Sequence, residues 1–229
     1  MNPRKLTLML FAWFAAAVLL GLLELHAATD DDAADEPRAV RVAVFKVAED
    51  PKTCFSDGFL VDVDRKSNLS VHRALIEVPL GDRKMYEHPL AIFSGEKGFQ
   101  VTEDRARALA LYLKRGGMLI GSANCGASAF DRDFRKLIAA ALPEAKFQVL
   151  DADHPLFTSL YEINKIRSNK PHDRPLEAIV IDDRLAVLYT PIGLSDSRAL
   201  AFECCCCGSN EILNARQINA NALVYAVTR

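Results

Sequence analysis

The sequence predicts an α/β fold in which helices cover both faces of a mostly parallel sheet. Short apolar runs alternate with amphipathic segments between residues 89 and 150, and this alternation is typical of strand–helix–strand units. The runs Pro89–Phe93 and Met118–Gly121 are apolar at nearly every position, as in strands that are buried on both faces. The carboxyl-terminal part has a different pattern, which indicates a hairpin followed by a final helix.

Composition limits the size and the class of the protein. The chain has 229 residues, half of them apolar, with 28 basic and 30 acidic side chains. This length suits one domain with a substantial core. The near-neutral charge gives no electrostatic basis for binding nucleic acid, and no cofactor is predicted.

The first 28 residues indicate a membrane-directed segment. Arg4 and Lys5 precede the uncharged run Leu6–Leu23, which approaches the length of about 20 residues that a membrane-spanning helix needs. Two interpretations stay open: a signal peptide within residues 1–28, or an uncleaved anchor in the inner membrane. Both predict an exported domain, periplasmic or tethered with its fold outside the cytoplasm.

Residues 29–37 are acidic and small, and they predict a linker. Residues 38–229 are predicted to form a single α/β domain. Its first elements are expected as a strand at Val40–Phe45, a short helix or loop within Asp50–Ser70, a strand at Arg73–Val78 and the strand Pro89–Phe93.

The next helix has clear signals at both ends. Thr102 is a suitable amino-terminal cap, and Glu103 and Asp104 place negative charge at the positive end of the helix dipole. Gly116 and Gly117 supply the conformation that ends a helix. The buried stripe is expected to comprise Ala106, Leu109, Ala110 and Leu113.

The remaining elements follow the same kind of pattern. After the strand Met118–Gly121, we expect an amphipathic helix from Phe130 to Ala141 and a further strand at Phe147–Leu150. The hairpin is expected from Leu176–Ile181 and Arg184–Thr190, joined by Asp182 and Asp183, and the final helix from Asn210 to Val227.

A candidate site follows from the predicted sheet, because ligands of such sheets bind beyond the carboxyl ends of the strands. Three loops are expected to meet there. They carry Ser94 and Gly95, then Asn124, Cys125 and Gly126, and then Asp153 and His154.

Cys125 and His154 form the candidate catalytic pair. A cysteine in a turn between a strand and a helix is a position for a thiolate nucleophile, with His154 as its base. Each residue also has a structural interpretation. Cys125 would be a small buried cysteine in a tight turn, and the His154 imidazole would cap a backbone group of its own loop.

The run Cys204–Cys207 leaves three states open: a disulfide bond, buried free thiols or a metal site. Neighbouring side chains of an extended strand point to opposite faces, so four consecutive thiols do not converge readily on one ion. We therefore predict no metal site.

The order of motifs resembles the bacterial family called domain of unknown function 4159. The motifs are Pro89-Leu-Ala-Ile-Phe-Ser-Gly95, the helix end Tyr112-Leu-Lys-Arg-Gly-Gly117, Met118-Leu-Ile with the following Cys125-Gly126, Phe130 with Phe134-Arg135, Asp153-His-Pro-Leu-Phe157, Arg184-Leu-Ala-Val-Leu-Tyr-Thr190, and a terminal helix with Asn221 and Tyr225. The resemblance covers roughly residues 38–229.

The resemblance implies a flavodoxin-like three-layer sandwich of the class I glutamine amidotransferase superfamily. It also implies an exported or membrane-tethered protein of the cell envelope with an envelope protein as partner. We expect a binding module without catalysis, the alternative being a cysteine-dependent amidase that uses Cys125 and His154. Members often carry adjacent aspartates where this chain has Ser122-Ala-Asn124.

Overall fold

The structure is a computed structural model that describes residues 39–229 except 51, 53, 170 and 201–210. The described strands are β1 (Val42–Lys46), β2 (Ile76–Pro79), β3 (Leu90–Gly95), β4 (Met118–Ala123), β5 (Glu177–Ile181) and β6 (Arg184–Thr190). The longer helices are α2 (Gly58–Lys66), α3 (Glu103–Lys114), α4 (Ser128–Ala141) and α5 (Ala215–Thr228). Short 3-10 turns are η1 (Arg83–Glu87), η2 (Asn124–Gly126), η3 (Pro155–Thr158) and η4 (Ser197–Ala199).

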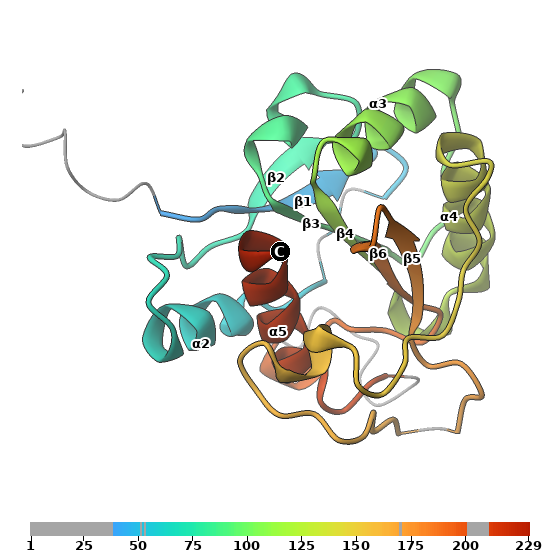
Figure 1. Cartoon of the computed structure of the whole chain (residues 1–229). Coiled ribbons are helices and arrows are strands. Elements are labelled where there is room, and N and C mark those ends of the chain that lie inside the picture. The colour runs from blue at the N-terminus through green and yellow to red at the C-terminus, as the bar shows by residue number, and fades with distance from the viewer. Residues whose placement is uncertain (1–38, 51, 53, 170, 201–210) are drawn as a thin grey trace, which may run out of the picture. The chain divides into compact units, whose positions relative to one another are not determined.

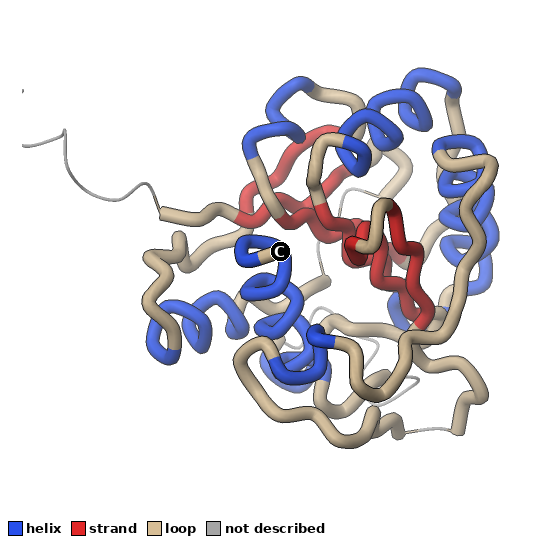
Figure 2. Tube along the Cα trace, viewed as in Figure 1, coloured by secondary structure: helices blue, strands red, loops and turns tan. Residues whose placement is uncertain are grey.

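The strands form one sheet of six in the order β2-β1-β3-β4-β6-β5. All neighbours run parallel except β5, which pairs antiparallel with β6. Figure 2 shows the strands as a single twisted layer between helices. The predicted α/β fold with a carboxyl-terminal hairpin is therefore confirmed, and its strand order begins 2-1-3-4 as in flavodoxin-like sheets.

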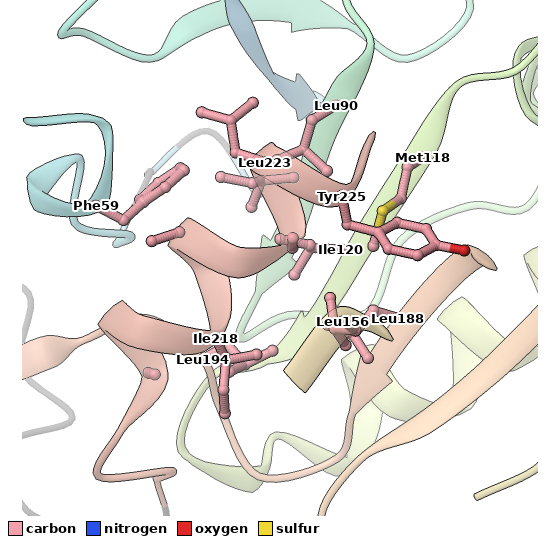
Figure 3. Packing of buried hydrophobic residues seen from close by; sticks show 14 of the residues in the cluster. Phe59, Leu90, Met118, Ile120, Leu156, Leu188, Leu194, Ile218, Leu223 and Tyr225 are labelled. Atoms are coloured by element: carbon pink, nitrogen blue, oxygen red, sulfur yellow. The ribbon is translucent and has the colours of Figure 1, made fainter. Parts of the chain in front are cut away.

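Helices cover both faces of the sheet, as Figure 1 shows. On one face, α2 and α5 pack over Val44, Leu90 and Ile120, and Figure 3 shows Ile218 and Leu223 of α5 in this cluster. On the other face, α3 and α4 enclose an aromatic cluster that comprises Phe45, Phe93, Phe99, Tyr112, Phe130, Phe134 and Tyr189. Burial of these two faces supplies the main driving force for folding.

The predicted helix after Thr102 is confirmed in detail. The Thr102 side chain accepts a hydrogen bond from Arg105 N, and Ala106, Leu109 and Leu113 are buried. Ala110 is half-buried. Gly116 has a φ of +104°, which is the left-handed conformation that favours glycine. Terminal signals therefore fixed this helix correctly.

The predicted hairpin is also confirmed. Asp182 and Asp183 have φ values of 50° and 59°, so both turn residues are left-handed, as a tight type I′ connection requires. Arg184, the first residue of β6, donates to the carbonyl oxygens of Leu113 at 2.7 Å and Gly117 at 3.2 Å. These bonds join the hairpin to the end of α3.

One predicted strand is wrong. Phe147–Leu150 forms a loop with a single antiparallel bridge, in which Gln148 N donates to Ala178 O at 2.9 Å and Ala178 N donates to Gln148 O at 2.7 Å. Val149 is 55% exposed, whereas Leu150 is buried and Phe147 packs against the aromatic cluster, so the segment buries side chains without pairing as a strand. The apolar run alone did not distinguish a strand from a loop at the sheet margin.

Other element boundaries shift by a few residues. Val40 makes only a bridge with Val71, and the first strand begins at Val42. The second strand begins at Ile76 rather than Arg73. Within the described residues the last helix begins at Ala215, because Ile212 instead bridges Ser168.

The segment 1–38 lies outside the described residues, and so do Cys204–Cys207. The predictions of a signal peptide or anchor, of the acidic linker and of the state of the four consecutive cysteines therefore remain predictions. In the part of the chain that the structure describes, no helix combines the length and the apolarity needed to cross a membrane.

Candidate functional site

The carboxyl edge of the sheet comprises the end of β3 with the residues after it, Ser94–Lys97, and the segments that follow β1 and β4, Val47–Asp57 and Asn124–Gly126. In the sheet, β2 lies on one side of β1, and β3, which follows β2 in the sequence, lies on the other side. The β1–β3 boundary is therefore the topological switch point, where doubly wound sheets bind their ligands. Four predicted rim residues lie at this edge: Ser94, Gly95, Asn124 and Gly126.

A buried network of hydrogen bonds joins the carboxyl edge to the loop after β6. Asn124 Oδ1 accepts from Ser195 Oγ at 2.7 Å and from Ser122 Oγ at 3.4 Å. Ser122 Oγ also accepts from Leu194 N at 2.9 Å, and Asn124 Nδ2 donates to Cys54 O at 3.5 Å. Asn124, predicted as a ligand contact, thus holds three chain segments together.

Cys125 occupies a sharp left-handed turn. Its φ and ψ are 56° and 16°, and Gly126 follows with a φ of +74°. This conformation is unfavourable for a residue with a side chain, and such residues cluster at functional sites. The turn predicted from the sequence is present.

Cys125 and Cys54 are both disulfide-bonded. A sulfur in a disulfide is neither a thiolate nor a general nucleophile. The chemistry predicted for Cys125 therefore has no reactive group in this state. The sequence offered a signal for this, since cysteines in loops of a chain that is predicted to be exported are candidates for oxidation.

His154 lies away from Cys125. Its ring lies tilted against the ring of Tyr225, with the ring centroids 5.4 Å apart, and Tyr225 Oη accepts from Leu185 N at the start of β6. Because β6 runs parallel to β4, the start of β6 is at the amino edge of the sheet, opposite the turn with Cys125. The expectation that His154 shares the rim with Cys125 is thereby corrected, and the reason is the missing strand at 147–150.

The His154 imidazole has a capping role. Its Nδ1 accepts from Leu156 N at 3.1 Å at the start of η3. Burial lowers the pKa of His154, while Asp151 and Asp153 act in the opposite direction. An unprotonated Nδ1 is what the cap requires. Asp153 is exposed beside it, and not at the carboxyl edge.

Two acidic residues after β1 were not predicted as part of the edge. Asp50 Oδ2 accepts from Glu96 N at 2.8 Å and Lys97 N at 3.1 Å, immediately after β3. Glu49 Oε1 accepts a hydrogen bond from Arg105 Nη1 at 3.1 Å. This hydrogen bond is the main cause that lowers the pKa of Glu49 to about 2. The loop after β1 is thus fastened to the loop after β3.

A cavity of about 530 Å³, lined by charged residues, lies between α4 and the hairpin. Glu177 is buried there and is paired with Arg135 at 2.5 Å and Arg174 at 3.1 Å. Arg135 also binds Asp131 and lies over the ring of Tyr189. Four of its charged residues, Asp131, Arg135, Arg174 and Glu177, are thus paired with one another, so we do not assign this cavity as the functional site.

A further cavity of about 440 Å³ lies at the amino edge and is lined by Tyr86, His88, Tyr112 and Arg115 among others. Among the described residues, no group of three or more His, Cys, Asp or Glu side chains is arranged to hold a metal ion. The prediction that Cys204–Cys207 form no metal site is not tested by this result.

The fold and the carboxyl edge define a doubly wound α/β protein in which two residues of that edge, Cys54 and Cys125, are disulfide-bonded and buried hydrogen bonds join its loops. The sequence matches the family described as "Domain of unknown function (DUF4159)" over residues 55–227. The chain therefore belongs to this family, and the resemblance read from the motifs is confirmed. No curated protein matches the chain.

Proposed function

We propose that this protein is a binding module of the bacterial cell envelope that acts without catalysis through the carboxyl edge. The observation that carries the proposal is the oxidised state of Cys125. At the position where related folds place a nucleophile, this chain has a sulfur that is already bonded. The presumed base, His154, caps a turn at the other end of the strands.

The rigidity of the carboxyl edge also supports binding. A surface that is fixed before a partner arrives loses little conformational entropy on association. The bonds of Asn124 to Ser195 and of Asp50 to Lys97 fix the loops after β1, β3, β4 and β6 at the carboxyl edge. This arrangement resembles a preformed recognition surface more than a site that opens and closes around a substrate.

Export is the second part of the proposal. Disulfides persist in oxidising compartments such as the periplasm, and Cys54 and Cys125 are both oxidised. The apolar run Leu6–Leu23 after Arg4 and Lys5 supplies a means of export or of tethering. The partner that we propose is an envelope protein.

The binding proposal is tested by affinity capture from membranes with the full chain. Asn124→Leu, which removes the bonds to Ser195 and Cys54, is compared with His154→Asn at the opposite edge. We expect a protein that is captured by the wild type and by His154→Asn but lost with Asn124→Leu. Equal capture by all three forms, or none by the wild type, contradicts the proposal.

The absence of catalysis is tested with a thiol-reactive hydrolase probe under non-reducing conditions. The wild type and Cys125→Ala are expected to show the same low labelling, because the sulfur of Cys125 is bonded. Labelling of the wild type that disappears in Cys125→Ala would restore the amidase alternative.

Export is tested by cell fractionation and by protease digestion of intact spheroplasts. We expect the domain in the periplasmic fraction if the amino-terminal segment is cleaved, or in the membrane fraction and digestible from outside if it is retained. A protein that is protected from protease inside spheroplasts contradicts export.

A further inference from the structure

Two buried side-chain atoms have no hydrogen-bond partner within the described part of the chain: Ser94 Oγ and Asn219 Oδ1. Ser94 is 8% exposed and Asn219 is 0% exposed. Burying a polar atom without a partner costs free energy, and the great majority of such atoms in folded proteins are hydrogen-bonded to protein or ordered water. These two atoms therefore indicate a place that receives a polar group from outside the described part of the chain.

Ser94 and Asn219 are connected through hydrogen bonds to the same residue, Leu194, by way of Ser122 on the strand next to Ser94. Ser94 is the register partner of Ser122 on β4, and strand alternation places both on the face that carries Ile92, under α5. Ser122 Oγ accepts from Leu194 N, and Asn219 Nδ2 donates to Leu194 O, each at 2.9 Å. Leu194 thus joins the strand pair that contains Ser94 to the helix that contains Asn219.

The two atoms require a particular kind of group. The Ser94 hydroxyl both donates and accepts, whereas the Asn219 amide oxygen only accepts. A partner for both must therefore have a proton to donate to Asn219. A hydroxyl group meets this requirement, and an ionised carboxylate does not.

The same edge is unsuited to anions. The amides of Glu96 and Lys97 follow β3, where a doubly wound sheet receives an anionic ligand group. The Asp50 carboxylate already accepts both amides, at 2.8 Å and 3.1 Å. It also places a negative charge next to Gly95, since a Cβ at Gly95 would lie 2.7 Å from Asp50 Oδ2.

We propose that the carboxyl edge binds a neutral hydroxyl group between Ser94 Oγ and Asn219 Oδ1. The hydroxyl comes from an internal water molecule or from a hydroxyl-bearing small ligand. The ligand source rests on the binding function proposed above, whereas the water source is independent of it.

The first test compares Ser94→Ala with Ser122→Ala by chemical denaturation of the full chain. Ser122 is the matched control, because it is the register neighbour of Ser94 and its hydroxyl has two partners in the fold. If a hydroxyl is bound, Ser94→Ala raises the unfolding constant about fivefold, as loss of one hydrogen bond does. An unchanged or lower unfolding constant in Ser94→Ala, with a raised one in Ser122→Ala, overturns the proposal.

The second test is a double-mutant cycle with Ser94→Ala and Asn219→Ala. If one hydroxyl bridges the two side chains, the double variant is less destabilised than the product of the single effects, by about threefold or more in the unfolding constant. Effects that multiply independently show that the two atoms do not share a bound group, and this overturns the proposal.

The third test distinguishes the two sources by NMR titration of the labelled full chain. Glycerol is the neutral probe and inorganic phosphate is the anionic probe. Shifts at Ser94, Gly95 and Asn219 with glycerol, reduced in Ser94→Ala, identify a site for ligand hydroxyls, and no shift together with the stability loss identifies water. Shifts of these amides with phosphate in the wild type overturn the neutral site, while Asp50→Ala is expected to gain them.

These results separate the two proposals. The stability effects of Ser94→Ala stand even if the affinity capture finds no partner for the domain. Conversely, a partner lost only in Asn124→Leu supports the binding function even if Ser94→Ala has no effect on stability.

Discussion

The two edges of the sheet use polar side chains for different purposes. At the carboxyl edge, polar groups connect loops that are far apart in the sequence, as the bond of Asn124 to Ser195 does. At the amino edge, polar groups secure one long loop on α5, where His154 caps η3 and Asn221 binds its backbone. The difference shows that a motif shared with a family can stabilise the fold at one edge while the proposed recognition surface lies at the other edge.

The largest effect is expected at the loop on α5. Asn221 Oδ1 accepts from Leu160 N and Tyr161 N, and Nδ2 donates to Leu156 O and Tyr161 O. Asn221→Leu leaves these backbone groups without partners, so we expect the free energy of unfolding to fall by about 3 to 5 kcal/mol. Chemical denaturation measures the loss.

Gln217→Ala on the same helix is the control for this change, because Gln217 makes none of the four bonds. A loss below about 1 kcal/mol in Asn221→Leu, similar to that of the control, would show that water replaces the amide. Hydrogen exchange is expected to increase in residues 154–161 and to remain unchanged at the carboxyl edge.

Reduction of the disulfides is expected to have the next largest effect, at the carboxyl edge. Treatment with a phosphine reductant releases Cys54 and Cys125, and we expect the free energy of unfolding to fall by about 2 to 4 kcal/mol. Hydrogen exchange is expected to rise in the loop after β1 and in the turn after β4. If exchange rises equally around His154, the two edges are not independent.

The smallest effect concerns the pH dependence of His154. Its folded pKa is lowered by burial, so below about pH 6.5 the unfolded chain binds more protons at this residue than the folded chain. The free energy of unfolding is therefore expected to decline as the pH falls through this region. Denaturation curves at several pH values between about 7.5 and 5 measure the decline.

His154→Asn keeps an acceptor for Leu156 N but removes the titrating group. The variant is expected to lose less stability than the wild type over the same pH range. The same pH dependence in both proteins would assign the effect to other histidines. The carboxyl edge is expected to be unaffected, since its bonds to Asn124 do not titrate there.

The fold was largely predictable because its signals are local. The Thr102 cap and the Gly116 ending fixed α3, and the pair Asp182-Asp183 fixed the hairpin, since each depends on residues close in the sequence. The loop at 147–150 was not predictable from its apolar run. Its state is decided by Ala178 on a later strand, which offers it only one bridge.

The candidate site was predictable only in part. Ser94, Gly95, Asn124 and Gly126 lie at the carboxyl edge because the first two end β3 and the others follow β4, and their role as a ligand rim remains a prediction. His154 was misplaced because its position depended on a strand that does not form. The hydrogen bond of Asp50 to Lys97 joins residues that are 47 positions apart in the sequence. Local sequence patterns do not predict a contact between residues so far apart.

The bridge at Gln148 has a consequence for how copies of this protein meet. An open outer strand invites sheets of two molecules to join edge to edge. Here Gln148 occupies hydrogen-bonding groups of Ala178 on the outer side of β5, and β2 at the opposite end has only four residues, the last of which is Pro79. The loop at 147–150 therefore hinders β5 from pairing with a strand of a neighbouring molecule.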